Sequence, residues 1–349
     1  MLKHKVITVK AAVYYTMDDI RIEEMPTPEI GPGEMLVEMK ACGVCGSDLM
    51  EWYLKDRAPL VLGHEPAGVV VEVGDGVEKF RPGDRVFVHH HVGCLSCHYC
   101  THGDFTMCEM FRKTHIHPGA FAEYFRVPQP NLQFDSLKIP DSISFEEATL
   151  IEPLACCIMA INKCKILPGD TVAVVGAGPA GVLLAILAKY RGASTVIISD
   201  LVDYRLNKAR EVGVDVAVNP SRENFVERVK AESDGRGADV VIVTAPSIPA
   251  LQSGLDACRR GGMLLLFAPT SPEKVLEVRP HRLFFDQISI IPSYSTTHVE
   301  TRMALNMIKA GRIDPNKIIT HRFPLERTGD ALRLAARSKE CLKVIVVNE

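Results

Sequence analysis

The sequence predicts an α/β protein made of a β-rich domain and a doubly wound parallel sheet. In the first part of the chain, short apolar stretches are separated by turn sequences, which is typical of antiparallel strands. From residue 168 onward, apolar runs alternate with helical patterns, which indicates a parallel sheet covered on both faces. The length of 349 residues and the hydrophobic fraction of 47% are sufficient for two separate cores.

The β-rich part is expected to contain strands wherever apolar residues cluster between turns that contain Gly, Pro or Asp. These strands are predicted at residues 10–15, 35–41, 68–73 and 85–89. The separating turns lie at residues 31–33, 74–76 and 81–84. Short turns of this kind join antiparallel neighbours, so the domain is predicted to be antiparallel.

In the second part, buried parallel strands are predicted at residues 171–175, 194–199, 214–218, 240–244 and 263–267. Helices are predicted between them at residues 181–190, 205–211 and 223–232. After residue 288 the pattern loosens to one amphipathic helix at 301–310 and a closing strand at 342–347. We expect domains at residues 1–155 and 156–289, with residues 290–349 returning to the first domain.

Composition excludes several classes of protein. Forty Lys and Arg residues face 43 Asp and Glu residues, a net charge of -3, and no run of basic residues suggests a nucleic-acid or anionic-membrane surface. The first ten residues lack the apolar stretch of a secretory signal, and glycines interrupt the most apolar window, residues 171–188. We therefore expect a cytoplasmic protein without a membrane span. Eleven cysteines, an odd number, favour metal binding over a disulfide framework.

A glycine-rich motif follows the strand at 171–175 and opens an apolar helix. In such a motif the first glycine permits a tight turn, the second lets a pyrophosphate approach, and the third lets helix and strand pack closely. The free amides at the helix N-terminus favour phosphate binding. The alternative is a helix start that binds nothing. The motif reads Gly176-Ala177-Gly178-Pro179-Ala180-Gly181.

Four further residues are candidates for contact with the dinucleotide. Asp200 ends the next apolar strand, where a carboxylate accepts hydrogen bonds from a ribose diol and repels a 2′-phosphate, so NAD is favoured over NADP. Arg205 weakens this preference because it could reach a 2′-phosphate, although it could also be a solvated helix residue. Thr244 and Phe267 end later strands, where they flank a nicotinamide or simply pack.

Four cysteines occur in one short loop with the spacing Cys-x2-Cys-x2-Cys-x7-Cys. Four thiolates close a tetrahedral shell without an open position, which predicts a structural zinc site. Iron–sulfur ligation and free thiols are the alternatives. The cysteines are Cys94, Cys97, Cys100 and Cys108.

A second, dispersed group of residues has the composition of a catalytic zinc site, which needs three protein ligands of mixed type and an open position. Each residue alone is more often a core residue than a ligand. The run His89-His90-His91 is better explained as a strand end with alternating faces than as further ligands. The group comprises Cys42, Cys45, Ser47, Asp48, His64, Glu65 and Glu152.

In the order of its motifs, the chain resembles the zinc-dependent medium-chain alcohol dehydrogenase superfamily, and within it the sorbitol (polyol) dehydrogenase branch. The resemblance extends from Lys10 to the C-terminus. It rests on the segments Cys45-Gly46-Ser47-Asp48, Gly63-His64-Glu65 and Ile151-Glu152-Pro153-Leu154-Ala155-Cys156, and on the four-cysteine loop.

The resemblance implies a GroES-like β-rich catalytic domain, with a zinc lobe near residues 94–108, and a Rossmann NAD-binding domain. Cys45 rather than Cys42, together with His64, would bind the catalytic zinc. Glu65 would be a direct or intermittent ligand. Glu152 would take the place that a second cysteine holds in simple alcohol dehydrogenases, and a second zinc would be structural.

The implied activity is hydride transfer between NAD and a secondary hydroxyl of a polyol, cyclitol or sugar-like substrate. Ser47 would take the hydroxyl proton, and Asp48 would orient His64. The alternatives are a dehydrogenase of L-threonine or of simple alcohols, and a zinc-stabilised NAD-binding protein without turnover. Candidate pocket residues are Glu51, Trp52, His115 and His117.

Two departures from the family pattern concern the substrate side of the site. Leu49 and Met50 follow Asp48, whereas many relatives place a histidine there as the outer end of a proton relay. The short loop at residues 53–59 leaves the pocket entrance unassigned.

A homo-oligomer, either dimer or tetramer, is expected. The resemblance implies that the apolar run at 288–292 forms a strand that pairs across a twofold axis, and the alternative is a strand in the interior.

Overall fold

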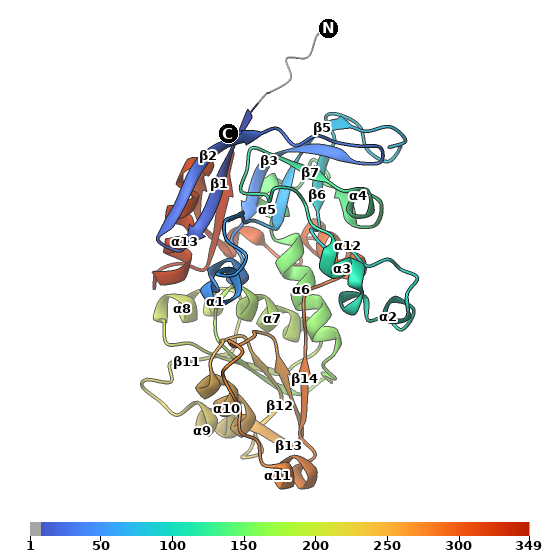
Figure 1. The fold of residues 1–349 in the computed structure, drawn as a ribbon. Coiled ribbons are helices and arrows are strands. Elements are labelled where there is room, and N and C mark those ends of the chain that lie inside the picture. The colour runs from blue at the N-terminus through green and yellow to red at the C-terminus, as the bar shows by residue number, and fades with distance from the viewer. Residues whose placement is uncertain (1–7, 349) are drawn as a thin grey trace. The chain divides into compact units, whose positions relative to one another are not determined.

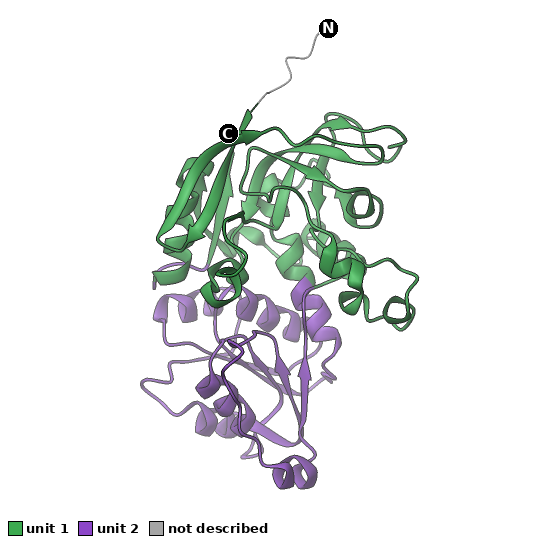
Figure 2. Cartoon of the chain, viewed as in Figure 1, with its two compact units in different colours: residues 1–155, 296–338, 343–349 green, residues 156–295, 339–342 purple. Residues whose placement is uncertain are grey.

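The computed structural model describes residues 8–348. The chain divides into two compact units, one of residues 1–155, 296–338 and 343–349, the other of residues 156–295 and 339–342 (Figure 2). The first boundary falls inside helix α6 (Ile151–Asn162). No helix within residues 8–348 has both the length and the apolar character needed to cross a bilayer.

Unit 1 is built on two sheets (Figure 1). The smaller sheet has the order β2-β1-β4, formed by β2 (Asp19–Pro26), β1 (Thr8–Thr16) and β4 (Leu60–Val61). The larger sheet has the order β15-β16-β3-β5-β6-β8, and β7 also pairs with β3. Its strands are β15 (Ile319–Pro324), β16 (Lys343–Val347), β3 (Met35–Gly43), β5 (Glu65–Val73), β6 (Arg85–Val88), β8 (Ser136–Lys138) and β7 (Tyr124–Val127).

Strand β3 is the centre of the larger sheet and positions several residues of the site. Its inward side chains Met35, Val37 and Met39 are fully buried. Its last residue, Gly43, lies opposite Glu65 of β5 on one edge and opposite Ile345 of β16 on the other. The C-terminal strand therefore completes a sheet that the N-terminal part of the chain begins.

Unit 2 is a six-stranded parallel sheet with the order β11-β10-β9-β12-β13-β14. Connections run outward in one direction from β9 through β10 to β11 and in the other from β12 to β14. Because parallel crossovers are right-handed, the two directions place helices on opposite faces. The strands are β9 (Thr171–Val175), β10 (Thr195–Ser199), β11 (Val216–Val218), β12 (Ala238–Val243), β13 (Cys258–Leu266) and β14 (Ser289–Pro292).

The helices of unit 2 begin where capping residues or prolines permit. Helix α7 (Pro179–Tyr190) has proline at its first position, where a missing N–H costs nothing. Helix α9 (Phe225–Ala231) is capped by Asn224, whose side chain accepts from the Glu227 amide. The remaining helices here are α8 (Asp203–Glu211), α10 (Ile248–Ala257) and α11 (Pro280–Asp286).

The predicted fold class, a β-rich unit and a doubly wound parallel sheet, is confirmed. Some helices and strands differ from the prediction, each for a physical reason. Strand β2 was not predicted because half of the residues in its sequence, DIRIEEMP, are charged, as an edge strand allows. Helix α6 was not predicted either. The strand predicted at 85–89 ends at Val88, so the histidine run follows the strand instead of belonging to it.

Candidate metal and nucleotide sites

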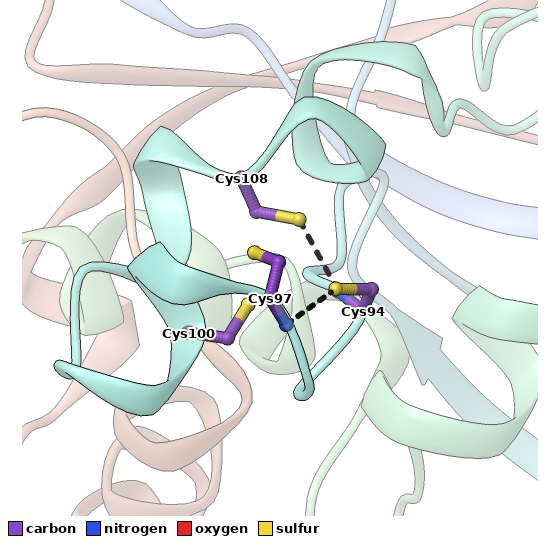
Figure 3. A group of neighbouring side chains, drawn as sticks. All are labelled: Cys94, Cys97, Cys100 and Cys108. Atoms are coloured by element: carbon purple, nitrogen blue, oxygen red, sulfur yellow. Dashed lines mark hydrogen bonds between the residues drawn. The ribbon is translucent and has the colours of Figure 1, made fainter.

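The four cysteines of the loop converge on one point (Figure 3). All four sulfur atoms lie within 4.8 Å of one another. The Cys94 amide donates to Cys108 Sγ at 3.4 Å, and the Cys97 amide donates to Cys94 Sγ at 3.3 Å. Hydrogen bonds from Ser96 and Cys97 lower the pKa of the Cys94 thiol to about 6. Four convergent sulfurs, two of which accept hydrogen bonds from backbone amides, fit a structural zinc ion, because four thiolates around one ion leave no position open.

A second convergent group consists of Cys45, His64 and Glu65, whose ligand atoms also lie within 4.8 Å of one another. Cys45 precedes the short helix η1 (Gly46–Leu49), and its amide donates to Asp48 Oδ2 at 2.9 Å. The other oxygen, Asp48 Oδ1, lies 3.3 Å from His64 Nδ1. Asp48 therefore joins the cysteine turn to the histidine, and His64 can present Nε2 as a ligand. Cys42 is fully buried and is not in this group.

The charge around His64 suits a cation. Burial alone lowers the pKa of His64, but Asp48 and Cys45 more than offset this and hold it well above the usual value. A field that stabilises a proton on the ring also stabilises a metal cation beside it. Sulfur, imidazole and carboxylate are ligand types that zinc prefers, so the residues present fit a catalytic zinc ion.

Glu65 is held from the other side by a lysine. Its Oε2 lies 2.5 Å from Lys343 Nζ, and both side chains are buried. The same ammonium group donates to the Val44 carbonyl at 2.8 Å. Burial raises the pKa of Glu65, as does Glu152, while Lys343 opposes the shift. A Cβ on Gly43 would lie 1.8 Å from Glu65 Oε2, so only glycine fits beside this ion pair.

Glu152 lies in the first turn of α6 and is buried, but its ligand atoms group with different residues. Within 4.8 Å it gathers with His89 and His90. The expected alternation of the histidine run is wrong, because His89 and His90 are both buried and follow the end of β6. Sequence reasoning missed these two histidines, and their only signal was three histidines in succession after a strand.

The histidine run forms a packed group of rings. The His90 ring centroid lies 4.7 Å from that of His64 and 4.1 Å from that of His91. Burial and the neighbouring histidines lower the pKa of His90 well below its usual value, and burial lowers that of His91 to about 3. Both rings are therefore neutral near pH 7. Among the predicted pocket residues, His115 lies beside this group, 5.7 Å from His90 between ring centroids.

Among residues 8–348, no ring contact joins the other three predicted pocket residues to the histidine run, although His117 interacts electrostatically with His115. Glu51 is exposed at the start of α1 (Glu51–Leu54), and His117 is exposed as well. Trp52 is half-buried, and its nearest aromatic partner is Tyr53, at 5.9 Å between ring centroids. Their role in binding a substrate stays a prediction.

The glycine motif in unit 2 has the shape of a phosphate cradle. Gly176 has φ +106°, and a Cβ there would lie 2.6 Å from Thr244 Oγ1. A Cβ on Gly181 would lie 1.9 Å from the Gly176 carbonyl oxygen, so the helix packs tightly on the turn. A Cβ on Gly178 would meet no atom within 4 Å, so the loop is open where a pyrophosphate would approach. The residues fit a dinucleotide.

The remaining nucleotide candidates are held by hydrogen bonds within unit 2. Asp200 accepts from the Ala177 amide at 2.8 Å and from the Val202 amide at 2.9 Å, which fixes its carboxylate beside the cradle. Thr244 Oγ1 donates toward the Val175 and Gly176 carbonyls, so it braces the turn.

Two candidates have other contacts. Arg205 Nε donates to the Cys341 carbonyl at 3.3 Å. Phe267 is half-buried just after β13, and its amide donates to the Val243 carbonyl at 3.1 Å. A role for either residue in binding the dinucleotide stays a prediction.

Replacing Asp48 by asparagine is expected to weaken the metal site without unfolding the protein. The amide keeps an acceptor for the Cys45 N–H but loses the charge that favours a cation at His64. Loss of a carboxylate that orients a metal-binding histidine typically lowers metal affinity or activity by about 10- to 100-fold. Turnover measured against free zinc concentration tests this, with Asp18→Asn on the exposed surface as the control. An unchanged zinc dependence would contradict the role of Asp48.

Comparison with known proteins agrees with this geometry. The family model described as alcohol dehydrogenase GroES-like domain matches residues 31–141, and the one described as zinc-binding dehydrogenase matches residues 179–310. A sorbitol dehydrogenase of Bacillus subtilis strain 168 is 36% identical over 350 aligned positions, with 97% of each chain covered. The chain belongs to the zinc-dependent medium-chain dehydrogenase family. The family predicted from the motifs is thereby confirmed.

Other medium-chain dehydrogenases show how widely the likeness extends. An L-threonine 3-dehydrogenase of Rhizobium etli strain CIAT 652 is 30% identical, with 93% of this chain and 94% of that protein covered. A zinc-binding dehydrogenase of Sinorhizobium meliloti 1021, whose crystal structure is bound to NADP, superposes with a TM-score of 0.87 at 28% identity. That match covers 97% of this chain and 99% of the other.

Proposed function

We propose that the protein is a zinc- and NAD-dependent dehydrogenase that oxidises a secondary hydroxyl of a polyol, cyclitol or sugar-like substrate. The observation that carries this proposal is the convergence of Cys45, His64 and Glu65, with Glu152 within electrostatic range of Glu65. A carboxylate at position 152, together with the similarity to a sorbitol dehydrogenase, favours a polyol over a simple alcohol.

Cys45, His64 and Glu65 would hold the catalytic zinc ion, and Glu152 supplies a second carboxylate near it. When bound, zinc supplies Lewis acidity that lowers the pKa of a hydroxyl group. Asp48 keeps the His64 ring in one orientation. Lys343 pairs with Glu65 and opposes the charge repulsion that Glu152 exerts on this buried carboxylate.

Ser47 is assigned the first proton transfer. It is half-buried, two positions after Cys45 in η1, and its Oγ would accept the proton of the substrate hydroxyl. Met50 cannot continue a relay, so Ser47 would pass the proton to water, to a ribose hydroxyl or to Glu51, which is exposed in the next helix. The glycine cradle of unit 2 and the neighbouring Asp200 would hold NAD, which supplies a hydride acceptor when bound.

The decisive experiment measures reduction of NAD by the purified holoenzyme with sorbitol, xylitol, myo-inositol, L-threonine, 2,3-butanediol and ethanol at equal concentration. We expect kcat/KM to be highest for a polyol or cyclitol. Activity on L-threonine alone would overturn the substrate class, and the similarity to an L-threonine 3-dehydrogenase makes this the second candidate. No turnover of any alcohol by zinc-loaded protein would favour a zinc-stabilised binding protein.

Asp200→Asn is expected to shift coenzyme preference toward NADP. The carboxylate repels a 2′-phosphate and accepts from a ribose diol, and a hydrogen bond to a charged group contributes about 1.5–3 kcal/mol, so the ratio of kcat/KM for NADP over NAD should rise roughly 10- to 100-fold. Glu211→Gln, which removes a carboxylate at the end of α8, is the matched control. An unchanged ratio in the Asp200 variant would contradict the assignment.

We also propose that the protein is a homo-oligomer that associates through unit 2. In the described part of the chain, β14 pairs with β13 alone and has an unpaired edge, and β14 corresponds to the predicted strand at 288–292. Phe284 and Phe285 on α11 are 74% and 68% exposed. Large exposed apolar groups beside an open strand edge favour association.

Phe285→Glu is expected to lower the molar mass in light scattering toward that of the 38.4 kDa monomer. The charge would have to be buried without a partner in the interface, which is costly. Leu201→Glu, at a residue that is 71% exposed elsewhere in unit 2, is the control. A wild-type protein that is monomeric, or a Phe285 variant with unchanged mass, would refute this interface.

We assign catalysis to unit 1 and NAD binding to unit 2, which extends past the expected boundary at residue 289 because β14 belongs to its sheet. All eleven cysteines lie in the described region without a disulfide, which suits a reducing compartment, and we place the protein in the cytoplasm.

A further inference from the structure

A third group of possible metal ligands consists of His89, His90 and Glu152. The proposed dehydrogenase chemistry gives a role to Glu152 but none to the two histidines. Their ligand atoms lie within 4.8 Å of one another, and all three residues are buried. The two histidines directly follow β6, and the glutamate lies in the first turn of α6. Two imidazoles and one carboxylate make a common set for a divalent transition metal.

His89 is oriented as a metal-binding histidine is. Its Nδ1 lies 2.9 Å from Asp135 Oδ2, and both side chains are fully buried. Asp135 is itself fixed by Thr301 Oγ1, which donates to Oδ1 at 2.6 Å. A carboxylate that accepts from Nδ1 sets the tautomer in which Nε2 carries the lone pair. His89 Nε2 is buried and has no hydrogen-bond partner among the residues that the structure describes.

His90 presents a second buried nitrogen. The residue is 8% exposed, and its Nδ1 is buried and lacks a hydrogen-bond partner among residues 8–348. Leaving a buried polar atom unpaired costs about 1–3 kcal/mol. Two such nitrogens, on residues whose ligand atoms converge with the Glu152 carboxylate, are better explained by a shared cation than by two separate losses.

We propose that His89, His90 and Glu152 bind a second divalent transition-metal ion next to the Cys45–His64–Glu65 site. The ring centroids of His64 and His90 are 4.7 Å apart, so the two ligand sets are neighbours. Glu152 has two carboxylate oxygens and can therefore serve both ions. The inference goes beyond the proposed function, which requires one catalytic and one structural zinc ion.

The test uses Co²⁺ as the probe. The labile metals of the full-length protein are removed with a chelator under conditions that keep the four-cysteine zinc ion, and Co²⁺ is then titrated while bound cobalt is counted. We expect two Co²⁺ ions per chain, one with a thiolate-to-cobalt absorption band from Cys45 and one without. Uptake of a single Co²⁺ ion by wild-type protein at saturation would overturn the proposal.

Variants then locate the second ion. His89→Gln and His90→Gln should each bind one Co²⁺ and keep the thiolate band, whereas His91→Gln, in the same histidine run but outside the ligand set, should bind two. Zinc retained in the four-cysteine site shows that a variant is folded. If a variant misfolds, the number of Co²⁺ ions bound by the wild-type protein and its absorption spectrum still test the proposal. The proposal is refuted if the His89 and His90 variants bind two ions, or if they lose the thiolate band together with the ion. These outcomes do not depend on turnover, so they are distinguishable from failure of the proposed activity.

Discussion

His64→Ala is expected to lower kcat/KM by about 10³-fold or more, because Lewis-acid stabilisation by a metal ion contributes several kcal/mol. The imidazole is one of three ligand types in the Cys45–His64–Glu65 group and lies 3.3 Å from the Asp48 carboxylate that orients it. Without it, sulfur and carboxylate alone must hold the ion. The measurement is kcat/KM for the best substrate of the panel, together with the zinc content of the variant.

His102→Ala is the control for this variant. His102 is exposed in the cysteine lobe and is not part of any of the described metal-ligand groups, so its loss should leave kcat/KM within about threefold of the wild-type value, as is usual for surface substitutions. A His64 variant that keeps wild-type zinc content and loses less than about tenfold in kcat/KM, or about 1.4 kcal/mol of transition-state stabilisation, would show that His64 is not a catalytic ligand.

Lys343→Met is expected to lower the free energy of unfolding by about 3–5 kcal/mol, the usual cost of removing one partner from a buried ion pair. The Glu65 carboxylate would remain fully buried without its cation, and the Val44 carbonyl would lose its donor. Chemical denaturation of the metal-free protein, followed by a signal from unit 1, measures the change.

Two further variants test whether the expected loss of stability comes from the burial of the ion pair. Lys10→Met breaks a lysine–glutamate pair with Glu326 of similar length, 3.0 Å, but both side chains are about half exposed, so the expected cost is only about 0–1 kcal/mol. The double variant Lys343→Met with Glu65→Gln should recover part of the loss, because the uncompensated charge is gone. Equal costs for Lys343→Met and Lys10→Met would refute this account.

The local motifs could be predicted from sequence because their physics is local. The turn at Gly176, the open position at Gly178 and the tight packing at Gly181 follow from backbone conformation within one strand–turn–helix unit. The four cysteines lie within one short loop, so their spacing alone brought their sulfurs together. The alternation of apolar strands with helices was sufficient to predict the doubly wound sheet.

Other parts of the site could not be predicted because strand register over long separations decides them. Lys343 reaches Glu65 only because β16 and β5 flank the end of β3 on its two edges, where Ile345 and Glu65 both lie opposite Gly43. Likewise, Glu152 groups with His89 and His90 because the first turn of α6 lies near the end of β6. The family resemblance had implied that Glu152 is a ligand of the Cys45 site, and the histidine run was expected to be a strand end with alternating faces.

By itself, therefore, the sequence determined the cysteine loop and the glycine cradle, since each lies within one short stretch of chain. The resemblance of its short motifs to a known family pointed to Cys45, His64 and Glu65. Only the tertiary structure decided that a buried lysine from the last strand neutralises Glu65 and that Glu152 faces two histidines. The reason is that a side chain's charge environment depends on which distant strands and helices pack beside it, and no local pattern specifies that.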